Sequence, residues 1–258
     1  MLSKANTLAG YKLQSLDGEI GKIKDFYFDD RDWMIRYLVA DTGGWLVSRQ
    51  VLISPHSLAG VYGGQGYIAV QLTKTEIEHS PSLNRDKPVS RQFEQDYSVF
   101  FGLPIYWGFP HEAAAQAESH EAGKKHDDPD LRSTHDVSGH HVEASDGEIG
   151  HVEDFLIDDE TWAIRYLIVD TKDWLPGKKV LISPKWIERV SWSEKQVVVA
   201  LTREAIQQAP EYTDSPPLTR DQEIALHRHY NRPGYWQVEA GGVDSVELGG
   251  EHPRSSLA

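Results

Sequence analysis

Cysteine is absent from the 258 residues of this chain, and methionine occurs only twice. Without cysteine the protein can form no disulfide, no thiolate metal site and no cysteine nucleophile. These three kinds of site are therefore excluded before any motif is considered.

Positive charge is also scarce, because 26 Lys and Arg residues face 40 Asp and Glu residues and the formal net charge is −14. Proteins that bind nucleic acid need a surplus of basic side chains to contact phosphates. The charge balance therefore argues against a nucleic-acid partner.

Long apolar runs are missing as well. No stretch approaches the roughly 20 apolar residues of a membrane-spanning helix, and the first residues hold no apolar core of signal-peptide length. The mean hydropathy of −0.51 fits a soluble protein. We therefore expect a cytoplasmic location and no integral membrane segment, while peripheral association with a membrane stays open.

The most informative feature present is an internal repeat. Residues 8–55 and 137–184 are identical at 24 of 48 positions, at a constant offset of 129. Both contain the pattern DGEIG, DF, DD, W, IRYL, DT, W and VLISP in the same order. This agreement indicates a duplicated domain.

The repeat continues less regularly beyond this block. The offset changes by six if Arg85-Asp86 is aligned with Arg220-Asp221, and it returns to 129 at the aromatic pairs Tyr106-Trp107 and Tyr235-Trp236. We divide the chain into residues 1–107 (first copy with a helical and aromatic tail), 108–133 (an acidic linker rich in Ala and His), 134–239 (second copy with its tail) and 240–258 (a Gly- and Ser-rich tail expected to be disordered).

The acidity is concentrated in the second half of the chain. The formal charge is −1 over residues 1–107, −3 over 108–133 and −10 over 134–258. The two copies are therefore unequal.

Short apolar segments separated by turns predict a mainly β fold, with two tandem small antiparallel barrels that are each followed by short helices. Asp-Gly signals mark tight hairpins, and Thr73-x-x-Glu76 predicts a helix cap. Both faces of the central hairpin are apolar, so its outer face must be covered by a helix, the other copy or a partner.

If residues 29–32 form the loop of that hairpin, Asp25 lies opposite Arg36 and, in the second copy, Asp154 lies opposite Arg165. Opposed residues share a face of the sheet. We predict that both pairs are structural ion pairs; an active-site role is the alternative.

Aromatic residues are the best candidates for an interaction surface. The chain has 8 Trp and 11 Tyr, and both types are enriched at interface hot spots. The alternative is that the rings pack the end of each copy onto its barrel. The candidates are Trp45, Trp174, Tyr106, Trp107, Tyr235 and Trp236.

No catalytic or cofactor motif is evident in the sequence. The Asp-Asp pairs at 29–30 and 158–159 could bind a cation, but Asp is also a favoured turn residue. Histidines concentrate between 111 and 151 without regular ligand spacing, which favours a solvated linker over a metal site. We expect no catalytic residue, no metal and no cofactor.

The ordered pattern from DGEIG to VLISP resembles the PRC-barrel family, here in tandem over roughly 8–80 and 137–210. That family includes the cytoplasmic domain of the photosynthetic reaction centre H subunit and the C-terminal domain of a ribosome maturation factor. The resemblance implies a non-catalytic module that docks onto proteins or membrane complexes.

Three functions follow as hypotheses. The first is a non-enzymatic docking module or scaffold that binds an unidentified protein or a second copy of itself. The second is an accessory or assembly factor of a photosynthetic or electron-transfer membrane complex, as the likeness to the H subunit implies. The third, remote, is a metal-dependent enzyme.

Overall fold

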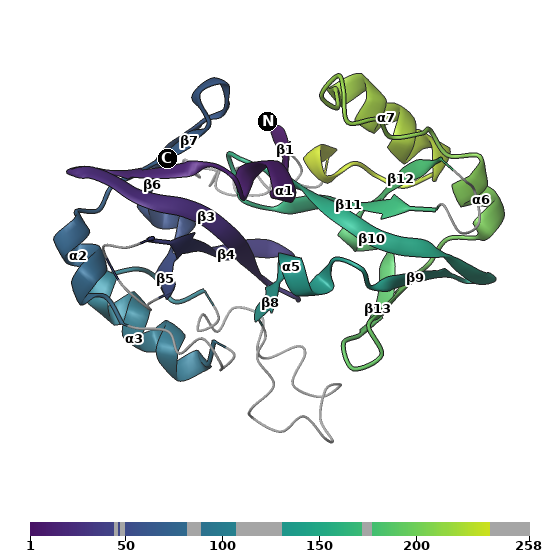
Figure 1. The fold of residues 1–258 in the computed structure, drawn as a ribbon. Helices are drawn as coiled ribbons and strands as arrows, with labels where there is room; N and C mark the ends of the chain where they lie inside the picture. Colours follow the sequence, from purple (N-terminus) through teal and green to yellow (C-terminus); the bar gives the residue numbers. More distant parts are fainter. Residues whose placement is uncertain (44–45, 47–49, 82–88, 107–130, 172–176, 238–258) are drawn as a thin grey trace, which may run out of the picture.

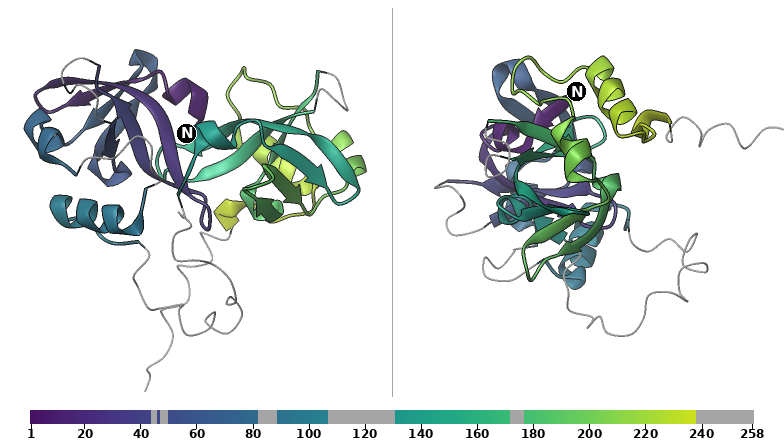
Figure 2. Two further views of the ribbon diagram at one scale, coloured as in Figure 1. Left: turned by 60° about the horizontal axis from the view of Figure 1, so that its bottom comes forward. Right: turned by 90° about the vertical axis from the view of Figure 1, so that its right-hand side faces the viewer.

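The computed structural model places two similar β-sheets side by side, one from each copy (Figures 1 and 2). The structure describes residues 1–43, 46, 50–81, 89–106, 131–171 and 177–237. Residues 108–130 of the predicted linker and the predicted disordered tail lie outside these residues.

The first sheet has seven strands in the order β5-β4-β3-β2-β7-β6, with β8 added to β3. Its strands are β2 (Lys12–Ser15), β3 (Gly18–Asp29), β4 (Met34–Asp41), β5 (Gln50–Ile53), β6 (Leu58–Tyr62), β7 (Tyr67–Val70) and β8 (Leu131–Ser133). Short 3-10 turns, η1 (Pro55–Ser57) and η2 (Gly63–Gln65), flank β6.

The second sheet repeats this arrangement as β12-β11-β10-β9-β14-β13, with β1 added to β10. Its strands are β1 (Leu2–Lys4), β9 (His141–Ala144), β10 (Gly147–Asp158), β11 (Ile164–Asp170), β12 (Lys179–Ile182), β13 (Ile187–Ser191) and β14 (Gln196–Val199), with η3 (Pro184–Trp186) before β13.

The prediction of antiparallel barrels is correct only in part. β2 pairs with β7, and β9 with β14, in parallel, so both sheets are mixed. Each parallel pair joins two strands that are separated by the whole central hairpin, a connection long enough for a parallel pairing. Among the described residues the pairing forms an open path and not a closed ring.

Two helices follow the last strand of each copy. They are α2 (Lys74–His79) and α3 (Arg91–Phe101) in the first copy, and α6 (Arg203–Gln207) and α7 (Arg220–His229) in the second. The predicted cap is present, because Thr73 and Glu76 form a reciprocal capping box. Tyr97 of α3 packs against Tyr37 of β4, so a helix of the same copy covers part of the apolar face of the hairpin.

The two longer helices correct the alignment of the copies. Ser90 caps α3, which begins at Arg91, and Thr219 caps α7, which begins at Arg220. The offset is again 129, so the structural counterpart of Arg220 is Arg91 and not Arg85. Arg85 itself lies outside the described residues.

The central hairpin has a different register from the one predicted. The loop includes Trp33, and Asp29 pairs with Met34, so the turn lies one residue later. The register shift between Tyr27 and Phe28 then places Phe26 opposite Leu38 and Asp25 opposite Val39, and a second shift follows between Asp25 and Ile23. The second copy has the same shifts, with Asp154 opposite Ile168.

The copies exchange their N-terminal segments. The first arm consists of β1 and α1 (Ala5–Leu8), and β1 pairs antiparallel with β10 of the second copy. The second arm consists of β8 and α5 (Thr134–Val137), and β8 pairs antiparallel with β3 of the first copy. Figure 1 shows each arm lying against the opposite sheet. The second copy therefore begins by Leu131, inside the predicted linker.

Asp25 fixes the second arm to the first copy. Its carboxylate accepts hydrogen bonds from the Ser133 hydroxyl (2.5 Å), the Thr134 hydroxyl (2.9 Å) and the His135 backbone N–H (3.2 Å). These donors lie at the start of α5, where a carboxylate satisfies otherwise unpaired backbone groups. Asp25 is therefore used in a contact between the copies.

Asp154 is the counterpart of Asp25, but its contact is poorer. It accepts from the Asn6 backbone N–H (3.2 Å) of the first arm, and its Oδ2 is buried without a hydrogen-bond partner among the described residues. Burial raises the pKa of the Asp154 carboxyl. The contact of Asp25 with the second arm should therefore stabilise the fold more than the contact of Asp154 with the first arm.

Replacing Asp25 with alanine is expected to lower the free energy of unfolding by about 2 kcal/mol, because two hydroxyls and one N–H lose their acceptor. Asp154→Ala is the matched comparison and should cost less at pH 7. Because folding raises the pKa of Asp154, its ionisation opposes folding, and the stability of the wild type relative to Asp154→Ala should increase as the pH falls from 7 towards 4. Thermal melts at both pH values check this; equal losses at pH 7 would contradict it.

The tips of the two hairpins also meet. The Ile35 N–H donates to the Trp162 carbonyl and the Ile164 N–H donates to the Trp33 carbonyl, both at 2.8 Å. Trp33 and Trp162 have positive φ angles of 56° and 61°, which turn the chain so that these carbonyls face the other copy. One hydrophobic core runs through both copies.

Candidate functional site

The C-terminal aromatic segment of the first copy returns to the central hairpin. The guanidinium of Arg36 lies 3.8 Å from the centre of the Tyr106 ring. The Tyr106 hydroxyl donates to Glu94 of α3 at 2.5 Å, and the Arg91 guanidinium donates to the other carboxylate oxygen of Glu94 at 3.1 Å. The structure thus joins one residue of each predicted set, Arg36 and Tyr106.

The second copy repeats this arrangement. Arg165 lies 3.9 Å from the centre of the Tyr235 ring, and the Tyr235 hydroxyl donates to Glu223 of α7 at 2.9 Å. Arg220 pairs with the same carboxylate at 3.0 Å and stacks on Trp236 at 4.4 Å. The two Arg–Tyr–Glu clusters are related by the offset of 129 residues.

Burial controls the protonation of these clusters. It raises the pKa of Tyr106 far above its usual value, and the neighbouring Glu94 carboxylate adds to the effect. Burial and Glu223 raise the pKa of Tyr235 to about 12. Both hydroxyls therefore keep their protons at neutral pH and donate to the carboxylates, so the clusters serve to hold the tail of each copy in place.

The predicted ion pairs are wrong in their acidic partners. Arg36 contacts Asp29 at 3.6 Å and Asp32 at 3.2 Å, and not Asp25. The register shift between Tyr27 and Phe28 leaves Arg36 as the extra residue of its strand, which directs it to the loop carboxylates.

In the second copy Arg165 contacts Asp158 at 3.0 Å, and not Asp154. The carboxyl oxygen of Asp158 accepts from two nitrogens of the guanidinium. Asp29 and Asp158, considered as possible cation ligands, are therefore the partners of the two arginines.

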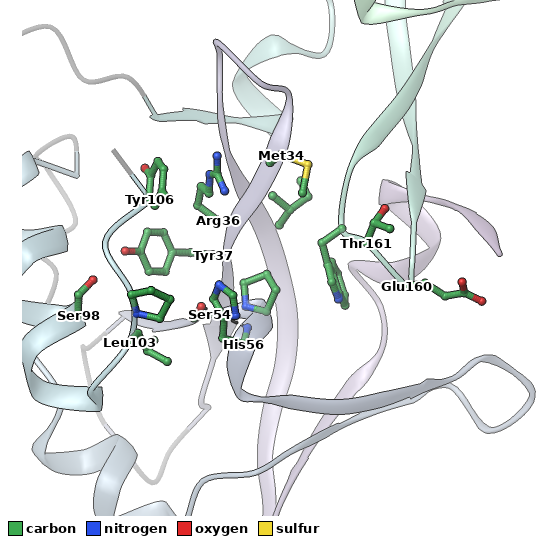
Figure 3. Close-up of a pocket in the computed structure, with 14 residues that line it drawn as sticks. Met34, Arg36, Tyr37, Ser54, His56, Ser98, Leu103, Tyr106, Glu160 and Thr161 are labelled. Atoms are coloured by element: carbon green, nitrogen blue, oxygen red, sulfur yellow. Dashed lines mark hydrogen bonds between the residues drawn. The ribbon is translucent and has the colours of Figure 1, made fainter. Parts of the chain in front are cut away.

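A cleft of about 280 Å³ opens beside Arg36 and Tyr106. Figure 3 shows these two side chains on one side and Glu160 and Thr161, from the hairpin tip of the other copy, on the opposite side. His56, which follows β5, lies at the base. We call this the first cleft; both copies contribute to its walls.

A larger groove of about 850 Å³ occupies the equivalent position in the second copy. It is lined by Arg165, Tyr235 and the turn at Ser183 and Pro184, together with the hairpin tip of the first copy. It also extends along β13 as far as Trp192. We call this the second groove.

The two openings differ in charge. His56 in the first cleft is replaced by Lys185 in the second groove, and Glu160 by Arg31. The second groove is lined by five basic and three acidic side chains, although the chain as a whole has an acidic excess. The opening in the more acidic copy is therefore locally basic.

The aromatic residues predicted to form an interaction surface divide into two groups. Trp45, Trp107 and Trp174 lie outside the described residues. Tyr235 is buried and Tyr106 and Trp236 are partly buried, so these three rings pack onto their own copies while Tyr106 and Tyr235 also line the openings.

No metal-binding group of three or more His, Asp or Glu side chains occurs in the part of the chain that the structure describes. His227 instead lies 3.0 Å from the Tyr166 hydroxyl and 2.9 Å from the Pro233 carbonyl. His140 is buried next to Trp192. Both are packing residues.

Glu94 and Glu223, the acceptors at the centre of the two clusters, were not among the residues predicted from the sequence. A signal was present, because both glutamates follow an arginine by three residues at the offset of 129. Aligning Arg220 with Arg85 concealed it. Arg189 of β13 and Trp192, which follows the strand, gave no signal because glycines stand at both equivalent positions of the first copy.

These features define a duplicated β-domain whose halves share one core and form two openings at their junction. The family model for the PRC-barrel domain matches residues 2–77 and again residues 129–206. The chain therefore belongs to the PRC-barrel family, and it contains the domain twice, as predicted. Both matches include the exchanged arms.

No curated protein matches the chain. No helix among the described residues is long and apolar enough to cross a membrane.

Proposed function

We propose that this protein is a non-enzymatic docking module that presents the openings at the junction of its two PRC-barrel domains to a protein partner. The observation that carries the proposal is that both copies contribute walls to each opening. A surface made from two copies exists only when they are assembled, and the exchanged arms hold them together.

The chemistry of the described residues supports docking over catalysis. The buried carboxylates Glu94 and Glu223 and the partly buried Asp25 are occupied by tyrosine, arginine and hydroxyl partners that fix the fold. Groups used in this way are positioned to stabilise the structure, whereas a general acid or base needs access to a substrate. A rigid platform with little ordering cost favours binding.

Cross-linking in the native cell tests this proposal. A lysine-reactive cross-linker followed by mass spectrometry should give links to another protein at Lys185, which lines the second groove, and few at Lys22, which lies on β3 away from both openings. Sedimentation of the purified chain shows whether the partner is a second copy. Links confined to the chain itself, together with a monomer in solution, would contradict docking.

A further inference from the structure

The second groove follows the edge of a strand. Four consecutive residues of β13, from Ile187 to Val190, line it. Side chains alternate between the two faces of a strand, so an opening that touches four in succession must run along the edge of the strand. β13 is the last strand of its sheet and pairs with β14.

The length and composition of the groove suit an extended peptide. From Ile187 to Trp192 it spans six residues of the chain, which is about 20 Å in a β-strand. Apolar side chains (Ile187, Val190 and Trp192) lie there on either side of the charged pair Glu188 and Arg189. The Trp192 ring is fixed beneath the guanidinium of Arg132 at 4.4 Å, so this apolar contact is already ordered before a ligand arrives.

The charge of the groove selects the class of peptide. Lys185 and Arg189 are exposed, and neither forms a salt bridge or side-chain hydrogen bond with any residue in the described part of the chain. Arg36 and Arg165 already contact Asp32 and Asp158. Lys185 and Arg189 are thus two cations of the groove lining that are available for a ligand.

We propose that the second groove binds an acidic segment of a partner protein in extended conformation, as a strand added to the edge of β13. The backbone of the peptide pairs with β13, and its carboxylates meet Lys185 and Arg189. The assignment rests on the docking function proposed above and names the surface and the partner chemistry. A nucleic acid is disfavoured by the net charge of −14.

The first copy explains why only one groove has this property. The counterparts of Lys185, Arg189 and Trp192 are His56, Gly60 and Gly63. Both the cations and the aromatic contact are thus absent at the equivalent positions. The duplication has left one opening basic and elongated and the other small.

Fluorescence anisotropy with the intact chain tests the proposal. The probe is a labelled eight-residue peptide that alternates Glu and Val. We expect it to bind, while a peptide alternating Lys and Val does not. Lys185→Glu with Arg189→Glu should weaken binding about tenfold or more, because two attractive contacts become repulsive.

The matched control is Lys22→Glu with Lys24→Glu, which changes the net charge equally at exposed positions of β3. It should bind like the wild type, and circular dichroism and melting of both variants establish that each is folded. Equal loss of binding in the two variants would overturn the assignment, since only overall charge would then matter.

Two further probes test whether the peptide binds as an added strand and whether the ligand is a protein. A peptide alternating Glu and Pro keeps the charge but lacks half of the backbone donors, so it should bind at least tenfold more weakly; equal binding would overturn strand addition. An oligothymidine of eight nucleotides that binds more tightly than the acidic peptide would overturn the choice of a protein ligand.

Failure of the groove assignment and failure of the docking proposal give different experimental results. If the partner found with the wild type still co-purifies from the cell with an affinity-tagged Lys185→Glu, Arg189→Glu variant, docking stands and the groove assignment fails. If the wild type binds the acidic peptide in vitro but gains no partner in the cell, the groove assignment stands and the docking role fails.

Discussion

Replacing Phe28 with alanine is expected to lower the free energy of unfolding by about 3–5 kcal/mol, the range for removing a fully buried aromatic side chain. Phe28 has no exposed surface. Its ring stacks on Trp33 with centroids 5.1 Å apart and lies 6.0 Å from Phe155 of the other copy. The cavity would therefore open where the two copies share their core.

The matched control is Phe100→Ala, the same chemical change at a side chain that is 45% exposed on α3. It should cost less than about 1 kcal/mol. Urea unfolding followed by tryptophan fluorescence and by circular dichroism measures both. Because the core is continuous, we expect one transition for Phe28→Ala at lower urea; two separate transitions, one unshifted, would show that the copies unfold independently.

Replacing Gly21 or Gly150 with alanine is expected to cost about 3 kcal/mol or more. Both glycines have φ near +140°, and a Cβ added at either would lie 2.0 Å from a backbone oxygen, of Asp41 or Asp170 respectively. Such an overlap forces two strands of the central hairpin apart. This close approach explains the last glycine of each DGEIG motif.

Gly10→Ala is the control, because its added Cβ would meet nothing closer than 3.7 Å. Differential scanning calorimetry should show a large fall in melting temperature for Gly21→Ala and Gly150→Ala and little change for Gly10→Ala. Unchanged melting of the Gly21 variant would mean that the hairpin can relax around a side chain at this position.

Much of the architecture could be predicted from the sequence because it rests on local signals. Asp-Gly turns, the Thr73 cap and the repeated apolar pattern depend on residues close together in the chain, and they recur in both copies. The family also followed from the ordered motif. The aromatic residues Tyr106 and Tyr235 were candidates because they recur at the same offset.

The register of the hairpin could not be predicted in the same way. A regular alternation places Asp25 opposite Arg36, but the turn lies one residue later and a bulge between Tyr27 and Phe28 shifts the pairing further. A bulge depends on how a strand must twist to pack against its neighbours, and that information is not local. Because of this shift, the predicted acidic partners of Arg36 and Arg165 were both wrong.

Two copies of a PRC-barrel domain, mainly β and different in charge, follow from the amino-acid sequence alone. The exchange of arms and the shared core became evident only in the folded molecule. The arms, residues 2–10 and 131–139, are identical at just two of nine positions. Each arm pairs with the opposite sheet through backbone hydrogen bonds, and backbone pairing leaves little trace in side-chain identity.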